Sequence, residues 1–353
     1  MEDVIIIGAG IGGLSTAYHL KKKNISFKIL EGQNRLGGRI ETIYGNLNTP
    51  MEMGATWFNK DHKNLIQLLT ELKIGYFEQQ NEGIALFETI SFEPPQQYFV
   101  PANTHSAYRV QGGTYHIIEK LHQNIGKENV VLNTEIVEII DESESVKIID
   151  SSGNTFRCKL LIMALPPKLL IDAILFSPSL PPTLYQIMRQ TQTWMSGAAK
   201  FSVEYKKPFW KKDGFSGSVY SQSGLATEIY DHSNFEETKF ALKGFLNSSA
   251  NHYSFKMRKE KVIEQLKHYF GNEAQDFESY NDKIWNDKYI QPNNDVFLPP
   301  HFNNGHSLFR ESYMNNKLFF TGTEVSPQFS GYMEGAIIAS IATHTSILRI
   351  IKK

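Results

Sequence analysis

The residues whose spacing could do chemistry begin with the glycines of Gly8-Ala9-Gly10-Ile11-Gly12-Gly13, which have the pattern GxGxxG. In such a pattern one glycine permits a tight turn, another lets backbone N–H groups approach a pyrophosphate, and the third lets a helix pack on a strand. Glu31 lies 18 residues beyond Gly13, where a carboxylate can accept hydrogen bonds from ribose hydroxyls. This spacing predicts a dinucleotide-binding site.

The elements around these glycines have the order that such a site needs. Residues 3–7 form a short β-branched run that glycine ends, and Leu14, Ala17 and Leu20 follow at helical spacing. Residues 26–30 have the composition of a second strand. Together they predict a βαβ unit at the start of the chain.

A second glycine pair follows this unit in Arg35-Leu36-Gly37-Gly38-Arg39. The pair would allow close backbone approach to a ligand, and Arg39 could hold a phosphate by paired charge-assisted hydrogen bonds. These features leave open whether the dinucleotide is NAD or FAD.

A resemblance bears on that choice. Gly8 to Gly13, Glu31, Leu36-Gly37-Gly38-Arg39 and Gly54-Ala55-Thr56-Trp57 together resemble the flavin-containing amine oxidase family, which includes monoamine and polyamine oxidases. Phe320-Thr321-Gly322-Thr323-Glu324 and the run from Phe329 to Ala336 resemble the C-terminal flavin motif of that family. The cofactor that the resemblance implies is FAD.

The resemblance also implies roles for the C-terminal motif. In the family its glycines and Thr323 lie against the pyrophosphate and ribityl chain, and the backbone near Met333 meets the flavin ring at a helix N-terminus. The positive end of a helix there would stabilise negative charge on the reduced ring.

Two side chains match catalytic positions of the family. Lys200 matches the lysine that holds a water against flavin N5, and burial would lower its pKa by desolvation. Tyr332 matches one of two aromatic side chains that flank the amine, where a ring face orients the substrate nitrogen. The second aromatic would fall near Asn294, but no tyrosine stands between Ile290 and Pro300, which is a departure from the family pattern. Trp285 matches a family tryptophan near the flavin.

The expected site therefore has two catalytic residues, Lys200 and Tyr332. The expected cofactor-binding residues are Gly8, Gly10, Ile11, Gly12, Gly13, Glu31, Gly37, Gly38, Arg39, Gly54, Ala55, Thr56, Trp57, Ile136, Trp285, Gly322, Thr323, Glu324, Gly331, Tyr332 and Met333.

Other kinds of chemistry are disfavoured. Some family members bond FAD through a cysteine, which here would fall near Asn293, whereas the only cysteine is Cys158 in an expected core strand. We therefore expect FAD to be bound non-covalently. The 11 histidines show no HExxH spacing and the chain has no GxSxG, so we expect no metal site and no hydrolase.

Composition limits the class of protein. The 353 residues suggest two domains, and 41% hydrophobic with 21% charged residues are typical of a globular chain. A net charge of −1 gives no overall attraction to nucleic acid. The acidic N-terminus does not resemble a signal peptide, residues 329–348 are too polar for a membrane span, and a single cysteine fits a reducing compartment. We expect a soluble, cytoplasmic protein.

Further patterns complete the expected fold. Helices are expected at 63–73, from Gly112 onward, at 257–270 and after Gly331, and strands at 130–140, 145–150, 155–164, 197–250 and 317–321. The three strands from 130 to 164 suggest a meander, and 81–105 has no clear period.

The predicted fold class is α/β, a Rossmann-like FAD-binding domain with an inserted substrate domain of α+β type and mixed sheet. The FAD-binding domain is assigned residues 1–80, 106–166 and 291–353, and the substrate domain residues 81–105 and 167–290.

The predicted function is FAD-dependent oxidation of a small-molecule amine. A hydride would pass to flavin N5, the imine would hydrolyse, and dioxygen or another acceptor would reoxidise the flavin, with hydrogen peroxide as product when it is dioxygen. The alternatives are a desaturase or dehydrogenase acting on an apolar substrate, and a flavin-binding protein without turnover. The sequence does not define the amine or the oligomeric state.

Overall fold

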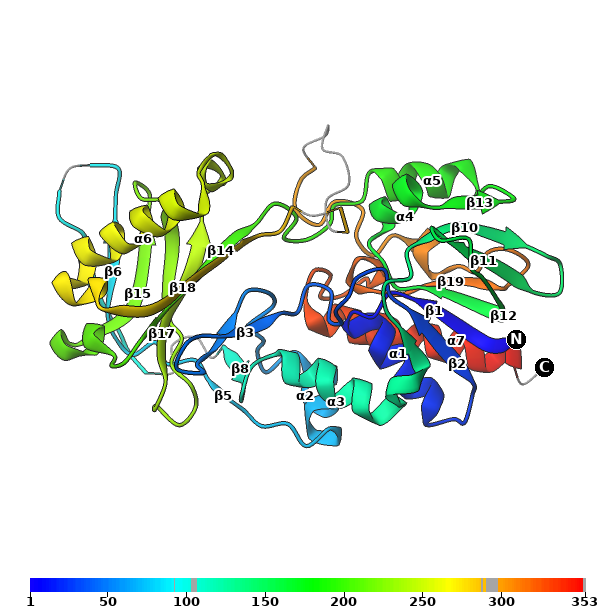
Figure 1. Cartoon of the computed structure of the whole chain (residues 1–353), viewed down its shortest axis with the longest axis horizontal. Helices are drawn as coiled ribbons and strands as arrows, with labels where there is room; N and C mark the ends of the chain where they lie inside the picture. The colour runs from blue at the N-terminus through cyan, green and yellow to red at the C-terminus, as the bar shows by residue number, and fades with distance from the viewer. Residues whose placement is uncertain (92, 103–106, 287, 290–297, 352–353) are drawn as a thin grey trace.

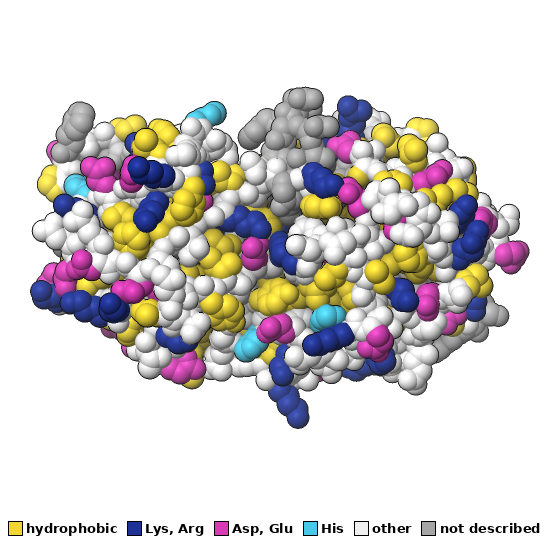
Figure 2. Space-filling model, in the orientation of Figure 1, with side chains coloured by type: hydrophobic (Ala, Val, Ile, Leu, Met, Phe, Trp, Pro, Cys, Tyr) yellow, Lys and Arg dark blue, Asp and Glu magenta, His cyan; other side chains and the backbone are white. Residues whose placement is uncertain are grey.

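The computed structural model describes residues 1–353 except 92, 103–106, 287, 290–297 and 352–353. It has an α/β fold with two parts, each built around one sheet, and the two ends of the chain lie together at one end of the molecule (Figure 1). On the face seen in Figure 2, acidic and basic side chains are interspersed over both parts, in keeping with the net charge of −1.

The first sheet has eight strands. Its order is β13-β10-β11-β12-β1-β2-β9, and β19 also pairs with β12. The bounds are β1 Glu2–Ile7, β2 Phe27–Leu30, β9 Val130–Val131, β10 Ile136–Asp141, β11 Val146–Asp150, β12 Thr155–Met163, β13 Leu175–Ser177 and β19 Leu318–Phe320.

The expected βαβ unit lies at the centre of this sheet. β1 pairs in parallel with β2 on one side and with β12 on the other. Helix α1, Ile11–Lys21, connects β1 to β2 and buries Leu14, Ala17 and Leu20 in the core. A parallel strand covered on both faces needs apolar residues in succession, which explains the run from Val4 to Ile7.

The expected meander is confirmed, with one change at its start. β10, β11 and β12 pair antiparallel in order. The predicted strand 130–140 is two strands, because β9 pairs with β2 while β10 begins only at Ile136. Asn133 between them has a φ of 55°, a left-handed conformation that asparagine tolerates better than most residues.

One segment assigned to the substrate domain belongs with the first sheet. Residues 167–189 contain α4 Pro167–Ala173, strand β13 and α5 Pro182–Arg189, and β13 pairs in parallel with β10. Leu170, Leu184 and Met188 are fully buried in the core beside that sheet. The proline pairs Pro166-Pro167 and Pro181-Pro182 lie at the starts of α4 and α5, where a residue without an N–H costs no hydrogen bond.

The second sheet has seven strands in the order β18-β14-β17-β16-β15-β6-β7. The bounds are β6 Gly83–Glu88, β7 Gln96–Val100, β14 Ala199–Tyr205, β15 Phe215–Ser221, β16 Ala226–Asp231, β17 Phe240–Leu246 and β18 Phe277–Ile284. β15 and β6 are parallel and the other neighbours are antiparallel, so the predicted mixed sheet is confirmed. Helix α6, Phe255–Phe270, lies over this sheet (Figure 1).

Two small sheets and three further α-helices complete the fold. Two small sheets pair β3 Thr42–Tyr44 with β4 Pro50–Glu52, and β5 Tyr76–Glu78 with β8 Tyr108–Val110. The remaining helices are α2 Lys63–Glu71, α3 Tyr115–Ile125 and α7 Met333–Ile351. The expectation that residues 329–348 are too polar for a membrane span is wrong, since α7 is long and apolar enough by length and composition alone. The helix nevertheless packs against α1 and buries Ala336, Ile337 and Ile347.

Candidate functional site

A cavity of about 260 Å³ lies where the carboxyl end of β1, the region around Gly54, strand β14 and the start of α7 meet. Segments far apart in the sequence line it, and most of the predicted site residues are among them. Those residues are Gly8, Gly10, Ile11, Gly12, Glu31, Gly37, Gly38, Arg39, Gly54, Ala55, Thr56, Trp57, Lys200, Trp285, Gly322, Thr323, Gly331, Tyr332 and Met333.

Glycines at this cavity allow backbone segments to approach more closely than a side chain would permit. A Cβ on Gly13 would lie 2.1 Å from the Gly8 carbonyl oxygen, so this glycine permits α1 to pack on β1. A Cβ on Gly12 would lie 3.3 Å from the Cα of Gly322, so the N-terminal and C-terminal motifs meet almost backbone to backbone. Gly10 has free space, since its Cβ would reach only Gly37 O at 4.0 Å. The motif therefore leaves room on the cavity side, as a pyrophosphate requires.

Three predicted cofactor-binding residues do not line the cavity. Gly13 is in the helix–strand contact just described. Ile136, the first residue of β10, is buried in a hydrophobic core, and Glu324 is buried and paired with Arg39. In the structure Gly13 and Glu324 support residues that do line the cavity, and Ile136 is a core residue.

Glu31 faces the cavity from the end of β2. Its carboxylate accepts hydrogen bonds from the backbone N–H groups of Ala9 at 2.6 Å and Gln33 at 2.9 Å. Burial raises the pKa of this carboxyl, and the two N–H groups oppose that change. The Glu31 carboxylate is thus fixed beside the first glycine motif, where it can accept hydrogen bonds from ribose hydroxyls.

Arg39 lines the cavity and is held by a distant part of the chain. Its guanidinium donates to both carboxylate oxygens of Glu324, at 2.7 and 3.0 Å, and to the Trp194 carbonyl at 3.2 Å. Much of its donor capacity is used by these partners, so contact with a phosphate stays a prediction.

Lys200 lies on β14 and is only 5% exposed. Its ammonium donates to the Gly54 carbonyl at 2.7 Å and lies 4.9 Å from the centre of the Phe245 ring. Burial lowers its pKa to about 8, and the nearby Glu52 carboxylate opposes the change. The burial and lowered pKa expected for this lysine are therefore present.

Tyr332 lies just before α7 and is 45% exposed. Its ring meets the edge of His62 at 5.4 Å, and its carbonyl accepts from Thr323 Oγ1 at 2.9 Å. The neighbouring Glu334 is buried and accepts from the backbone N–H groups of Asn64 and Leu65 at the start of α2. A carboxylate at a helix N-terminus is stabilising, so α2 helps to fix the start of α7.

Sequence reasoning missed several aromatic side chains at the cavity. Phe245 lies opposite Lys200 in the β14–β17 register, and Trp194 stacks on His301 at 4.2 Å. Only the strand pairing brings Phe245 to the site, and no local pattern marks it. The positions near Asn293 and Asn294, considered for a covalent bond and for a second aromatic, lie outside the described residues.

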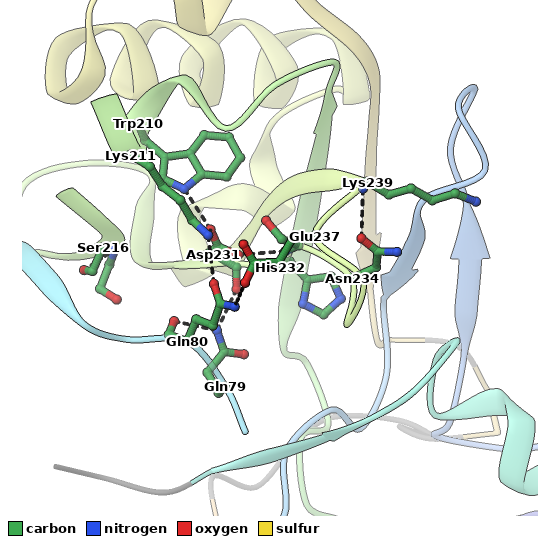
Figure 3. Close-up of polar contacts among 12 residues, drawn as sticks. Gln79, Gln80, Trp210, Lys211, Ser216, Asp231, His232, Asn234, Glu237 and Lys239 are labelled. Carbon is green, nitrogen blue, oxygen red and sulfur yellow. Dashed lines mark hydrogen bonds and ion pairs between the residues drawn. The ribbon is translucent and has the colours of Figure 1, made fainter. Parts of the chain in front are cut away.

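A network of hydrogen bonds connects Trp57 to the second sheet. Its indole Nε1 donates to Gln79 Oε1 at 3.0 Å, and Gln79 Nε2 donates to the Asp231 carbonyl at 2.8 Å. The Asp231 side chain accepts from Trp210 Nε1 at 2.9 Å and lies 3.6 Å from Lys211 Nζ (Figure 3). Trp57 is therefore fixed through Gln79 to the second sheet.

The residues present fit FAD. Gly12 and Gly322 approach closely at one side of the cavity, and Glu31 and Lys200 add an acceptor and a buried amine. The chain's single cysteine, Cys158, is fully buried in β12, so a thioether bond to the cofactor is excluded. Within the described ranges, no group of three or more His, Cys, Asp or Glu could hold a metal ion.

Comparison with known proteins agrees with this site. Residues 11–91 and 83–343 match the family described as flavin containing amine oxidoreductase. A probable flavin-containing monoamine oxidase A of Dictyostelium discoideum is 24% identical, covering 96% of this chain and 95% of that protein. A Synechocystis L-amino acid dehydrogenase is 21% identical over 99% and 95% of the two chains.

Solved structures show the same fold. Cyclohexylamine oxidase from Brevibacterium oxydans superposes with a TM-score of 0.86 at 19% identity, covering 100% of both chains. Putrescine oxidase bound to putrescine gives 0.84 at 19% identity, covering 100% of this chain and 99% of the other.

The chain belongs to the flavin containing amine oxidoreductase family. It is accordingly an FAD-dependent oxidoreductase of the amine oxidase type, with FAD bound non-covalently.

Proposed function

We propose that this enzyme oxidises a small-molecule amine with dioxygen as electron acceptor. When bound, FAD would take a hydride at N5 from the carbon next to a neutral amine nitrogen and pass the electrons to dioxygen, giving hydrogen peroxide, while water hydrolyses the imine. The observation that carries the proposal is that Lys200 and Tyr332 line one cavity with the glycine motifs.

The chain's residues would supply positioning and proton control. A Lys200 amine with a pKa of about 8 is partly neutral near that pH, so it can both accept and donate hydrogen bonds to a water in the cavity. The ring of Tyr332 offers a π face to the amine, and its exposed fraction gives substrate access from solvent. The aromatic side chains Trp57, Trp194 and Phe245 would exclude water around the reacting carbon.

The test is anaerobic reduction of the purified flavoprotein by a panel of primary, secondary and polyamines and amino acids. We expect one class to bleach the flavin absorbance, and air to restore it with one hydrogen peroxide formed per amine oxidised. If no amine bleaches a flavin that dithionite still reduces, the proposal is wrong. Restoration by an artificial acceptor but not by air would contradict the oxidase part alone.

A further inference from the structure

A second buried lysine lies near the site and has no role in the scheme above. Lys243 is fully buried on β17. Side chains alternate along this strand: Leu242 and Leu246 pack in the core of the second sheet, while Ala241 packs with residues of β4 on the other face. Lys243 therefore lies on the face that carries Phe245 and, through the β14 pairing, Lys200.

The contacts of Lys243 are with the cavity wall. Its Nζ donates to Thr56 Oγ1 at 2.5 Å and lies 4.7 Å from the centre of the Trp57 ring. Both Thr56 and Trp57 line the cavity. Phe245, whose ring lies 4.9 Å from Lys200 Nζ, is 6.3 Å from Trp57 between ring centroids. Lys243 and Lys200 are thus connected through the neighbouring rings of Trp57 and Phe245.

Burial of the Lys243 amine is costly, and in the described part of the chain no ion pair offsets that cost. An amine removed from water loses several kcal/mol unless it is paired. Burial lowers the pKa of Lys243 and the nearby Glu52 carboxylate opposes that change. Glu52 itself accepts from Thr42 Oγ1 and the Thr114 N–H, and none of the ion pairs among the described residues includes Lys243. An apolar residue of similar length would be less costly at this position. Its specific partners are the two wall residues.

Trp57 is held at three places. Lys243 contacts its ring, Gln79 accepts from its Nε1, and Tyr230 meets it edge-on with ring centroids 5.0 Å apart. We propose that Lys243 is a positioning residue, which through Thr56 and Trp57 fixes the cavity wall beside Lys200. An effect of Lys243 on catalysis rests on the function proposed above. Its effect on the position of Trp57 can be tested without turnover.

The test without turnover uses the flavin fluorescence of the FAD-loaded protein. A tryptophan close to a flavin quenches its emission by electron transfer, with a steep dependence on distance, so the decay difference between wild type and Trp57→Phe measures the contribution of Trp57. We expect Lys243→Met to remove at least half of that difference, and to have no further effect in the Trp57→Phe background. Lys317→Met, which removes a buried lysine paired with Asp141 away from the cavity, is the control and should leave the decay unchanged.

The kinetic test uses the same variants with whichever amine reduces the wild type. Loss of one hydrogen bond predicts that the half-saturating amine concentration rises about 10-fold in Lys243→Met, with a smaller change in the limiting reduction rate. Lys243→Gln, whose amide can still donate to Thr56, should recover most of the loss. Should Lys243→Met fail to fold, Thr56→Val removes the acceptor of Lys243, together with the 3.2 Å hydrogen bond from Thr56 Oγ1 to the Gly54 carbonyl, and should shift the decay in the same direction.

The outcomes separate the two proposals. A Lys243→Met protein with the wild-type decay, or one whose decay change persists without Trp57, overturns the role of Lys243 even if amines reduce the flavin. A decay change that depends on Trp57 supports the role of Lys243 in fixing the cavity wall, even if no amine reduces the wild type. Failure of every amine to reduce the wild-type flavin would refute the proposed function and not the role of Lys243.

Discussion

The guanidinium of Arg39 and the carboxylate of Glu324 form a two-bonded ion pair, at 2.7 and 3.0 Å, between residues 285 positions apart. Glu324 is 2% exposed, whereas the Arg39 side chain is 25% exposed. The pair joins the second glycine motif to the C-terminal motif, so it connects two sides of the flavin cavity.

This asymmetry in burial predicts unequal effects of removing each partner. Arg39→Met leaves a buried carboxylate unpaired and should lower the free energy of unfolding by about 3 kcal/mol, whereas Glu324→Gln leaves a charge that water can reach and should cost about 1 kcal/mol. Urea unfolding of both variants and the double variant measures this. Equal losses in the two single variants would show that the pair is not buried as described.

Two glycines of the first glycine motif, Gly10 and Gly13, should respond differently to alanine. Gly10→Ala should fold, because its Cβ would reach only Gly37 O at 4.0 Å, but should weaken FAD binding, because that Cβ enters the cavity. Gly13→Ala should lose the fold, since its Cβ would overlap the Gly8 carbonyl oxygen. Circular dichroism and FAD titration of the two proteins test this pair. A folded Gly13→Ala protein with the wild-type helix content and normal FAD binding would refute the packing role of Gly13.

Lys200 should give the reaction a characteristic pH dependence. Burial lowers its pKa to about 8, so the amine is protonated below that pH and neutral above it. If neutral Lys200 is the active form, anaerobic flavin reduction should rise with pH through about 8, and Lys200→Met should be at least about 10-fold slower and lack this step. Stopped-flow reduction at a series of pH values is the measurement. Unchanged reduction and reoxidation rates in Lys200→Met would remove Lys200 from the mechanism.

Tyr332 should act through its ring and not its hydroxyl. Tyr332→Phe keeps the aromatic face and should retain the reduction rate within about 3-fold, while Tyr332→Ala loses an aromatic contact worth about 1 kcal/mol or more and should fall about 10-fold. Both rates come from the same anaerobic assay. Equal losses in the two variants would assign the effect to the hydroxyl group.

Features that depend on residues close together in the sequence, or on a motif of the family, were predicted correctly. The strand, glycines and helix from Val4 to Leu20 and the buried, pKa-lowered Lys200 follow from short patterns or from the family resemblance, and the structure places both at the cavity. The strand meander was predicted for the same reason, since its turns separate the apolar runs.

What could not be predicted depends on pairing between distant segments. Phe245 reaches the cavity only because β17 pairs with β14, and Glu324 meets Arg39 only after the whole chain has folded. Residues 167–189 were assigned to the substrate domain although β13 pairs in the first sheet, because proline pairs occur at helix starts as well as at domain boundaries. Contacts between distant segments determine where these residues lie, and the composition of the surrounding sequence does not indicate such contacts.

The meeting of Gly12 with Gly322 also has a consequence for biosynthesis. A ribosome adds roughly 5 to 20 residues per second, so on the order of tens of seconds separate the synthesis of these two glycines. During that interval the nascent chain presents one half of the cavity without the other. The cavity can therefore be complete only after residues up to the start of α7 have emerged, and FAD can meet its full set of contacts only from that point on.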